Sequence, residues 1–177
     1  MNAGNATAAR AAGDRSGFTY SPSLNHVAVT VPDLGAAVDW YTSVLGFEVL
    51  HGPVEFGLDG AGEGASLPDV FGERFRKMRI CWLATGGQTG IELFELVDPP
   101  TEISPSFEYW RTGLMHLALT VGDVDAVVAR IDATGGQRAS KTWEWYEDHH
   151  YAYCRDPWGT VIELTDMSYD RINANRA

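Results

Sequence analysis

The sequence predicts an α+β protein made of two copies of one strand–helix–three-strand unit. An internal repeat is the first sign: residues 24–38 (LNHVAVTVPDLGAAV) align with residues 114–128 (LMHLALTVGDVDAVV) at a shift of 90. A second repeated segment follows at a shift of 71, where Ile-Glu-Leu at 91–93 matches Ile-Glu-Leu at 162–164. The same order of strand-like and helix-like runs fills both copies. The chain is therefore a duplicated unit.

Each copy opens with a strand and a capped helix. The alternating, β-branched runs 25–31 and 115–121 predict the strands. Asp33 and Asp123 stand at the N-cap position of segments 34–45 and 124–134, whose apolar residues have helical spacing. Gly46 and the pair Gly135–Gly136 are expected to end these helices.

Three strand-like runs then complete each copy. They cover residues 47–51, 79–84 and 90–96 in the first copy, and 137–140, 149–155 and 160–167 in the second. The sequence Asp-Pro-Trp-Gly at 156–159 predicts a hairpin turn between the last two. The two shifts differ by nineteen residues, which we assign to an insertion in the first copy. Such an insertion is either a lid over a site or a tolerated surface loop.

This pattern predicts a simple domain organisation. We expect residues 1–20 to form a disordered N-terminal tail, because this Ala- and Gly-rich segment lacks the apolar stretch of a secretory signal. The first module is expected over 21–98 with its insertion at 52–77, and the second over 114–168. A linker at 99–113, packed as a short helix, joins them, and 169–177 is the C-terminal tail.

Composition excludes several classes of function. The net charge of −11 repels phosphate backbones, so nucleic acid is not expected as a partner. No apolar run approaches the ~20 residues that cross a bilayer, so no membrane association is expected. Two cysteines, Cys81 and Cys154, are too few for a disulfide scaffold and are expected to pack in the core. Together these features predict a cytoplasmic protein.

Four polar residues occupy equivalent places in the two copies. His26 and His116 alternate with aliphatic residues, so each imidazole points away from the strand face that covers a helix. Glu92 and Glu163 are each flanked by Ile and Leu, so each carboxylate also opposes an aliphatic face. Glu95 lies on the other face of its strand and is rejected as an alternative.

Such a repeated couple predicts a metal site. Two units related by a pseudo-twofold axis would bring both imidazoles and both carboxylates to a common centre. These donors balance the charge of one divalent metal ion and suit Zn, Ni, Co, Mn or Fe(II). Coordination positions left open would take water or substrate oxygens. The predicted ligands are His26, Glu92, His116 and Glu163.

The motifs resemble those of the vicinal oxygen chelate superfamily, which includes glyoxalase I, methylmalonyl-CoA epimerase, extradiol dioxygenases, and fosfomycin- and bleomycin-resistance proteins. The resemblance extends over residues 24–167 and is carried by LNHVAVTVPDLGAAVDWYTSVLGF, GIELFE, GLMHLALTV and YCRDPWGTVIEL. It implies two βαβββ modules that form a curved, mixed eight-stranded sheet around one metal ion. It also implies a homodimer.

Ligand identity separates the members of this superfamily. The chain is similar to glyoxalase I at all four ligand positions, whereas related epimerases usually carry Gln at the position of Glu92. Extradiol dioxygenases and the fosfomycin enzymes use only two His and one Glu. The resemblance therefore implies a lyase or isomerase. Glyoxalase I typically has an Arg four residues after its first His, where this chain has Thr30, so a related lyase or epimerase is a second candidate.

The implied reaction is metal-dependent proton abstraction from a small, oxygen-chelating substrate, through an enediolate-like intermediate. Glu163 is the first candidate for the base and Glu92 the second, and both are therefore predicted catalytic residues. General-base catalysis of this kind contributes on the order of 10²–10⁴-fold to the rate.

Two alternatives remain open. Strand 149–155 places His149, Tyr151 and Tyr153 on one face, and extradiol enzymes resemble this chain in carrying a Tyr at the position of Tyr153, which favours an Fe(II) ring-cleaving dioxygenase. Many aromatic residues also suit an apolar cleft, as in a resistance protein that sequesters an aromatic natural product. The predicted substrate-pocket residues are Thr30, Thr120, His149, Tyr151 and Tyr153.

Overall fold

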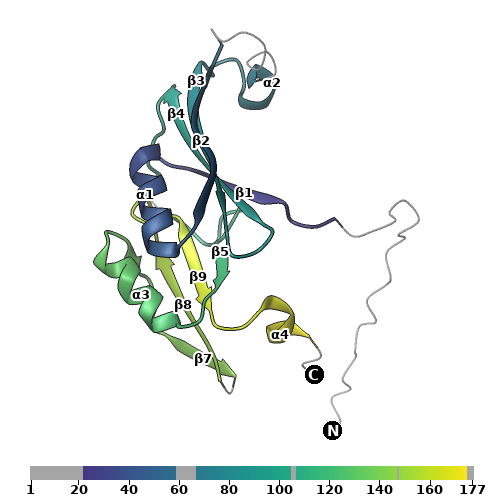
Figure 1. Ribbon diagram of the computed structural model, residues 1–177, viewed down its shortest axis with the longest axis vertical. Coiled ribbons are helices and arrows are strands. Elements are labelled where there is room, and N and C mark those ends of the chain that lie inside the picture. Colours follow the sequence, from purple (N-terminus) through teal and green to yellow (C-terminus); the bar gives the residue numbers. More distant parts are fainter. Residues whose placement is uncertain (1–21, 59–66, 105–106, 147, 175–177) are drawn as a thin grey trace, which may run out of the picture.

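The computed structural model describes residues 22–58, 67–104, 107–146 and 148–174. The expected N-terminal tail at 1–20 lies outside the described residues, as does segment 59–66 of the predicted insertion. The described elements cover both predicted modules (Figure 1).

Each module follows the predicted order, with additions. The first contains β1 (His26–Thr30), α1 (Leu34–Leu45), β2 (Glu48–Gly57), α2 (Leu67–Phe71), β3 (Lys77–Ala84) and β4 (Gly90–Asp98). The second contains β5 (Leu117–Thr120), α3 (Val124–Ala133), β6 (Gln137–Arg138), β7 (Trp143–Tyr146), β8 (His149–Arg155), β9 (Val161–Thr165) and α4 (Tyr169–Asn173).

Two mixed sheets result, one from each module. The first has the strand order β1-β4-β3-β2, and the second has the order β5-β9-β8-β6 with β7 also paired to β8. In both, the opening strand is parallel to the closing strand, and the other pairs are antiparallel. The α+β class and the paired βαβββ modules are confirmed. The described strands do not join into one eight-stranded sheet, because β1 and β5 are each an edge strand of a separate sheet.

Both helix starts and the end of α1 follow the predicted capping residues, whereas α3 ends at Ala133 with Thr134, not Gly135–Gly136, as its C-cap. Asp33 and Asp123 have extended backbones, and each accepts a hydrogen bond from the amide three residues later, at 3.0 and 2.9 Å. These bonds satisfy amides that the first helical turn leaves unpaired. Gly46 ends α1 in the left-handed region, with φ of 73°, which a residue without Cβ adopts freely.

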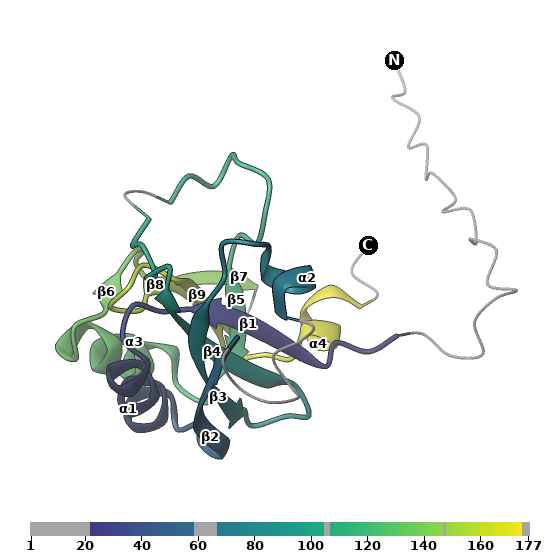
Figure 2. The same cartoon turned by 90° about the horizontal axis from the view of Figure 1, so that it is seen from above.

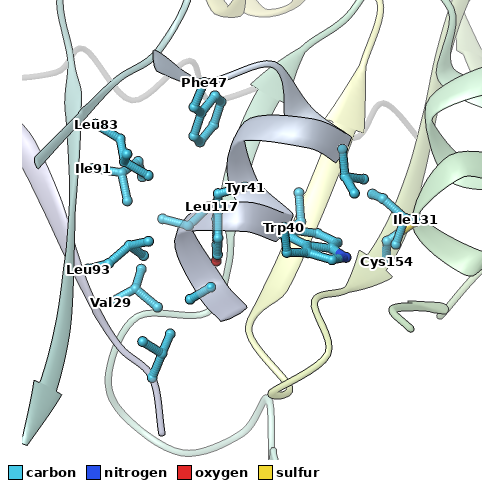
Figure 3. Close-up of a cluster of buried hydrophobic side chains, with 14 of the residues drawn as sticks. Val29, Trp40, Tyr41, Phe47, Leu83, Ile91, Leu93, Leu117, Ile131 and Cys154 are labelled. Atoms are coloured by element: carbon cyan, nitrogen blue, oxygen red, sulfur yellow. The ribbon is translucent and has the colours of Figure 1, made fainter. Parts of the chain in front are cut away.

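The two modules share one hydrophobic core in which α1 occupies a central place (Figure 3). Helix α1 packs against both α3 and the first sheet, and Trp40 donates from Nε1 to the Thr134 carbonyl oxygen at 3.1 Å. The view from above shows α1 and α3 side by side (Figure 2). Cys81 and Cys154 are both buried and unpaired, so their predicted core role is confirmed.

One expectation outside the repeat was wrong, and two other segments contain elements that the sequence did not predict. The linker shows no helix among its described residues; Pro99 and Pro100 supply no amide donors there, and Val97 makes only an isolated bridge to Pro100. Part of the insertion extends β2 to Gly57, because this run still alternates and pairs with β3. The C-terminal tail contains a helix, α4, over Tyr169–Asn173.

Candidate metal centre and substrate pocket

The first module places His26 and Glu92 together, and we call them the first pair. Strands β1 and β4 are parallel with Ala28 opposite Glu92, so His26 lies diagonal to the carboxylate, with Nε2 3.5 Å from Oε2. Trp82 donates from Nε1 to the other carboxylate oxygen at 2.9 Å. His26 Nδ1 lies 2.8 Å from the Asn25 side-chain oxygen, which can only accept, so Nδ1 is the donor in this bond.

The second module repeats this arrangement with His116 and Glu163, the second pair. Ala118 lies opposite Glu163, in the same register, and His116 immediately precedes β5. The His116 Nε2 atom is 2.9 Å from Glu163 Oε2. Tyr153, opposite Glu163 on β8, donates to its carboxylate. Burial and the neighbouring carboxylate raise the pKa of Tyr153 to about 12, so the phenol remains a donor at neutral pH.

The duplication extends to a third member in each module, of which the sequence analysis named Tyr153 but not Trp82. Trp82 stands ten residues before Glu92 and Tyr153 ten residues before Glu163, and each donates to its carboxylate from the neighbouring strand. The sequence contains this ten-residue spacing in both modules, but Trp in one and Tyr in the other hid the equivalence of the two positions. Both carboxylates are thus oriented by a donor, as ligating or catalytic carboxylates commonly are.

The four predicted ligands are brought together as two pairs and not as one set. Within the described ranges, no cluster of three or more His, Cys, Asp or Glu side chains is arranged to hold a metal ion. Imidazole nitrogen and carboxylate oxygen are suitable donors for a divalent ion. Protein sites for such ions usually supply three or four ligands. Each pair therefore fits half of a metal site.

Both pairs stand beside exposed sheet edges. The side chains of His26 and His116 are 45% and 26% exposed. Large apolar residues just before the opening strands are also uncovered: Leu24 is 67% exposed and Leu114 is 65% exposed. Unpaired strand edges with apolar neighbours are typical of surfaces that pair with another chain.

A hollow of about 290 Å³ lies beside the second pair. Among the predicted pocket residues, Thr120, His149 and Tyr151 line it together with Glu163. Tyr153 is adjacent, with its ring centroid 5.5 Å from that of His116. Thr30 is elsewhere, in a separate hollow by the β8–β9 turn. The remaining lining residues are Ala118, Trp145, Tyr146, Thr165, Tyr169, Ile172 and Asn173.

Sequence reasoning missed Thr165 and the contribution of α4. Thr165 lies two residues after Glu163 on β9, so strand alternation alone places it on the same face as the carboxylate. Tyr169, Ile172 and Asn173 come from the short helix α4, which no pattern in the sequence predicted.

The rejection of Glu95 as a ligand agrees with its position. Its side chain is buried on the helix-facing side of β4, where it pairs with Arg79 and accepts from the Leu34 amide at 2.9 Å. Leu34 is the first residue of α1, so Glu95 stabilises the start of that helix. Glu92 and Glu95 therefore have separate roles on opposite faces.

Paired βαβββ modules with a His–Glu pair on each define the class of protein. Residues 23–164 match the Glyoxalase/Bleomycin resistance protein/Dioxygenase superfamily, and the chain belongs to this family. No described helix is long and apolar enough to cross a membrane.

Individual relatives add detail. A 2-epi-5-epi-valiolone epimerase from an Actinomyces species is 34% identical over 158 residues, covering 85% of this chain and 82% of the relative. A glyoxalase family protein from Bacillus cereus is similar in structure, with a TM-score of 0.68, 22% identity, and coverage of 80% of this chain and 91% of that one. Glyoxalase I from Zea mays has a TM-score of 0.56 at 21% identity, over 82% of this chain and 44% of its own. The two structural likenesses establish the fold.

Proposed function

We propose that this protein is a metal-dependent epimerase that inverts a carbon beside a carbonyl group in a small, oxygen-rich substrate. The observation that carries this proposal is the equivalence of the two His–Glu pairs, each with the same strand register and a donor holding its carboxylate. Similarity to a 2-epi-5-epi-valiolone epimerase supports it, because that relative is named for an inversion of this kind. We extend its substrate class, a hydroxylated cyclic ketone, to this chain.

The metal site of this proposal lies between two copies of the chain. The first pair of one copy and the second pair of the other would together supply His26, Glu92, His116 and Glu163. Separation of the pairs within one chain supports this, as do the free edges of β1 and β5 and the exposed Leu24, Leu114 and Met115 beside them. The homodimer is isologous, so each dimer contains two equivalent sites.

The chain's own residues suit proton transfer. A divalent ion, when bound, supplies Lewis-acid polarisation to adjacent substrate oxygens. Glu163 receives the proton from the carbon beside the carbonyl group, while the hydrogen bond from Tyr153 keeps the Glu163 carboxylate in place. Glu92, from the other pair, is held by Trp82 and, in its protonated form, donates its proton to the opposite face of the carbon. Proton exchange of both carboxyl groups with water then restores their starting states. Removal on one face and return on the other inverts the stereocentre.

Deuterium incorporation tests the reaction directly. Protein purified without chelators is incubated with 2-epi-5-epi-valiolone in D₂O, and NMR follows the epimeric product and its deuterium at the inverted carbon. We expect Glu163→Gln to lower the rate by roughly 10²–10⁴-fold. Full turnover in Glu163→Gln would exclude Glu163 as the base. Oxygen uptake with catechols after anaerobic Fe(II) loading would favour a dioxygenase, and metal-free binding of an aromatic compound without turnover would favour a resistance protein.

Complementation tests the shared site. His26→Ala and His116→Ala copies are each inactive alone, because either change breaks both sites of its homodimer. In a mixed dimer, one site loses both histidines and the other retains all four ligands. Re-association of an equal mixture should therefore restore about a quarter of the activity, on statistical assembly of a twofold dimer. Sites formed within single chains would give no recovery on mixing.

A further inference from the structure

A continuous row of aromatic rings crosses the second sheet from the metal ligand pair to a buried histidine. His116 meets Tyr153 with ring centroids 5.5 Å apart, and Tyr151 follows at 6.2 Å from Tyr153. His149 is 6.2 Å beyond Tyr151, and Tyr146 is 6.0 Å beyond His149. The row follows one face of β8, the face that borders the hollow beside Glu163.

His149 is tightly packed, but only one of its two ring nitrogens has a hydrogen-bond partner among the described residues. Its side chain stacks on Tyr146 and Tyr151 at interplanar angles of 23° and 28°, and the residue is 3% exposed. Nε2 lies 2.8 Å from the Thr165 hydroxyl oxygen, and Thr165 is itself 7% exposed. Nδ1 is buried and has no hydrogen-bond partner among the described residues. Because a buried polar atom without a partner costs about 1–3 kcal/mol, packing alone does not explain this histidine.

His149 and Thr165 together offer a hydrogen-bond donor and an acceptor in either tautomer of the imidazole. If Nε2–H donates to Thr165, Nδ1 is an acceptor and the threonine hydroxyl is free to donate. If the threonine hydroxyl donates to Nε2, Nδ1–H is a donor and the threonine oxygen retains lone pairs. An alcohol group donates one hydrogen bond and accepts others, so one alcohol complements Nδ1 and a second complements the threonine hydroxyl in both cases.

We propose that His149 and Thr165 anchor separate hydroxyl groups of one hydroxylated six-membered ring bound in the hollow. This inference rests on the proposed function, because it places the reacting carbon of the same ring at Glu163. Thr165 follows Glu163 by two residues on β9, so their Cα atoms are about 7 Å apart, a separation that a ring and its substituents can span.

The other walls of the hollow fit such a ligand. Trp145, Tyr146 and Tyr151 present flat apolar surfaces, against which the C–H groups of a saturated ring can pack. Thr120 and Asn173 add polar groups to the lining. A volume of about 290 Å³ corresponds to about ten waters at about 30 Å³ each, which is room for a single substituted ring.

Binding of scyllo-inosose, a polyhydroxylated cyclohexanone, tests the anchor independently of turnover. In the full-length, metal-loaded protein labelled with ¹⁵N-histidine, saturation should shift the side-chain nitrogen signals of His149. The His149→Phe variant keeps an aromatic ring between the two tyrosines but removes both nitrogens, and we expect it to raise the Kd about tenfold. Thr165→Val should have a similar effect, and the double variant should lose less than the product of the two losses, because the groups act as one unit.

His150→Phe is the matched control, since His150 is the next residue of β8 and is exposed on its other face. This variant should leave the Kd for scyllo-inosose unchanged. Wild-type His149 signals that do not move at any concentration of scyllo-inosose would overturn the anchor, as would an unchanged Kd in folded His149→Phe.

The proposed reaction and the anchor fail in different ways. If 2-epi-5-epi-valiolone gains no deuterium but scyllo-inosose still depends on His149 for binding, the anchor holds and the reaction is wrong. If the wild type is an epimerase and His149→Phe has the same KM, the anchor alone is wrong.

Discussion

Tyr41 and Asp156 join the two modules through a hydrogen bond inside the shared core. Tyr41 Oη donates to Asp156 Oδ2 at 2.9 Å, and both residues are buried. Asp156 Oδ1 accepts from the amides of Trp158 and Thr160, so the same carboxylate also organises the β8–β9 turn. Burial, reinforced by this carboxylate, raises the pKa of Tyr41, which keeps its hydroxyl protonated as a donor.

Tyr41→Phe should therefore weaken the fold and not the chemistry of the site. The variant leaves Asp156 Oδ2 buried without its partner, so we expect the free energy of unfolding to fall by about 1–3 kcal/mol. Urea unfolding followed by fluorescence measures this change. Tyr109→Phe is the control, because Tyr109 is 68% exposed and its loss should change stability by less than about 0.5 kcal/mol. Equal stabilities for the two variants would contradict the assigned role.

Glu92 and Glu95 should differ in the property that each controls. Glu92→Ala removes a proposed metal ligand, and we expect divalent metal affinity to fall by at least about tenfold with little loss of stability. Glu95→Ala leaves the Leu34 amide and Arg79 without their partner and should lower the free energy of unfolding by about 2 kcal/mol, sparing metal affinity. Isothermal titration and urea unfolding measure the two quantities. A metal-binding defect in Glu95→Ala would argue against separate roles.

The ion pair of His150 and Asp166 should stabilise the protein over a limited pH range. The hydrogen bond that His150 Nδ1 donates to the Asp166 carboxylate raises the pKa of His150, helped by the charges of Asp166, Glu144 and Asp148. Burial acts to raise the pKa of Asp166, but the hydrogen bonds from the amide and ring of His150 outweigh it and the pKa is lowered. The contribution of Asp166 to the free energy of unfolding is lost as pH falls through its lowered pKa. The contribution of His150 is complete below the ordinary histidine pKa of 6.5 and is lost as pH rises through its raised pKa.

Asp166→Asn should consequently destabilise the protein more at pH 5 than at pH 9. At pH 5 both partners are charged in the folded wild type, whereas at pH 9 the imidazole is neutral. Free energies of unfolding for the wild type and variant at both pH values measure this difference. A gap between the two proteins that does not change with pH would show that the pair contributes no electrostatic stabilisation.

Gly136 should tolerate no side chain. A Cβ at this position would lie 2.5 Å from Ile131 Cγ2 and 2.7 Å from the Arg155 carbonyl oxygen, where α3 turns back onto β8. We expect Gly136→Ala to lower the free energy of unfolding by about 1–3 kcal/mol, the usual cost of overpacking. Gly122→Ala provides the comparison, because a Cβ there meets nothing within 4 Å. Thermal unfolding of both variants checks the difference, and equal melting temperatures would refute it.

Much of the fold was predictable because its signals are local. Helix α1 begins after Asp33 and ends at Gly46 as expected, since capping depends on a few neighbouring residues. Strand alternation correctly put His26 and Glu92 on one face and Glu95 on the other. The expected linker helix is absent from the described residues, where residues 109–113 form turns and bends instead.

The sequence alone determined three features: the duplicated His–Glu pairs, the strand faces on which they lie, and the capped helices. Each depends on side-chain periodicity or on contacts between residues a few positions apart. Tertiary structure was needed to find that the couples stay apart in one chain, that α4 borders a hollow, and that His149 is buried against Thr165. These features arise from packing between distant segments, and no local pattern encodes the contacts that hold such segments together.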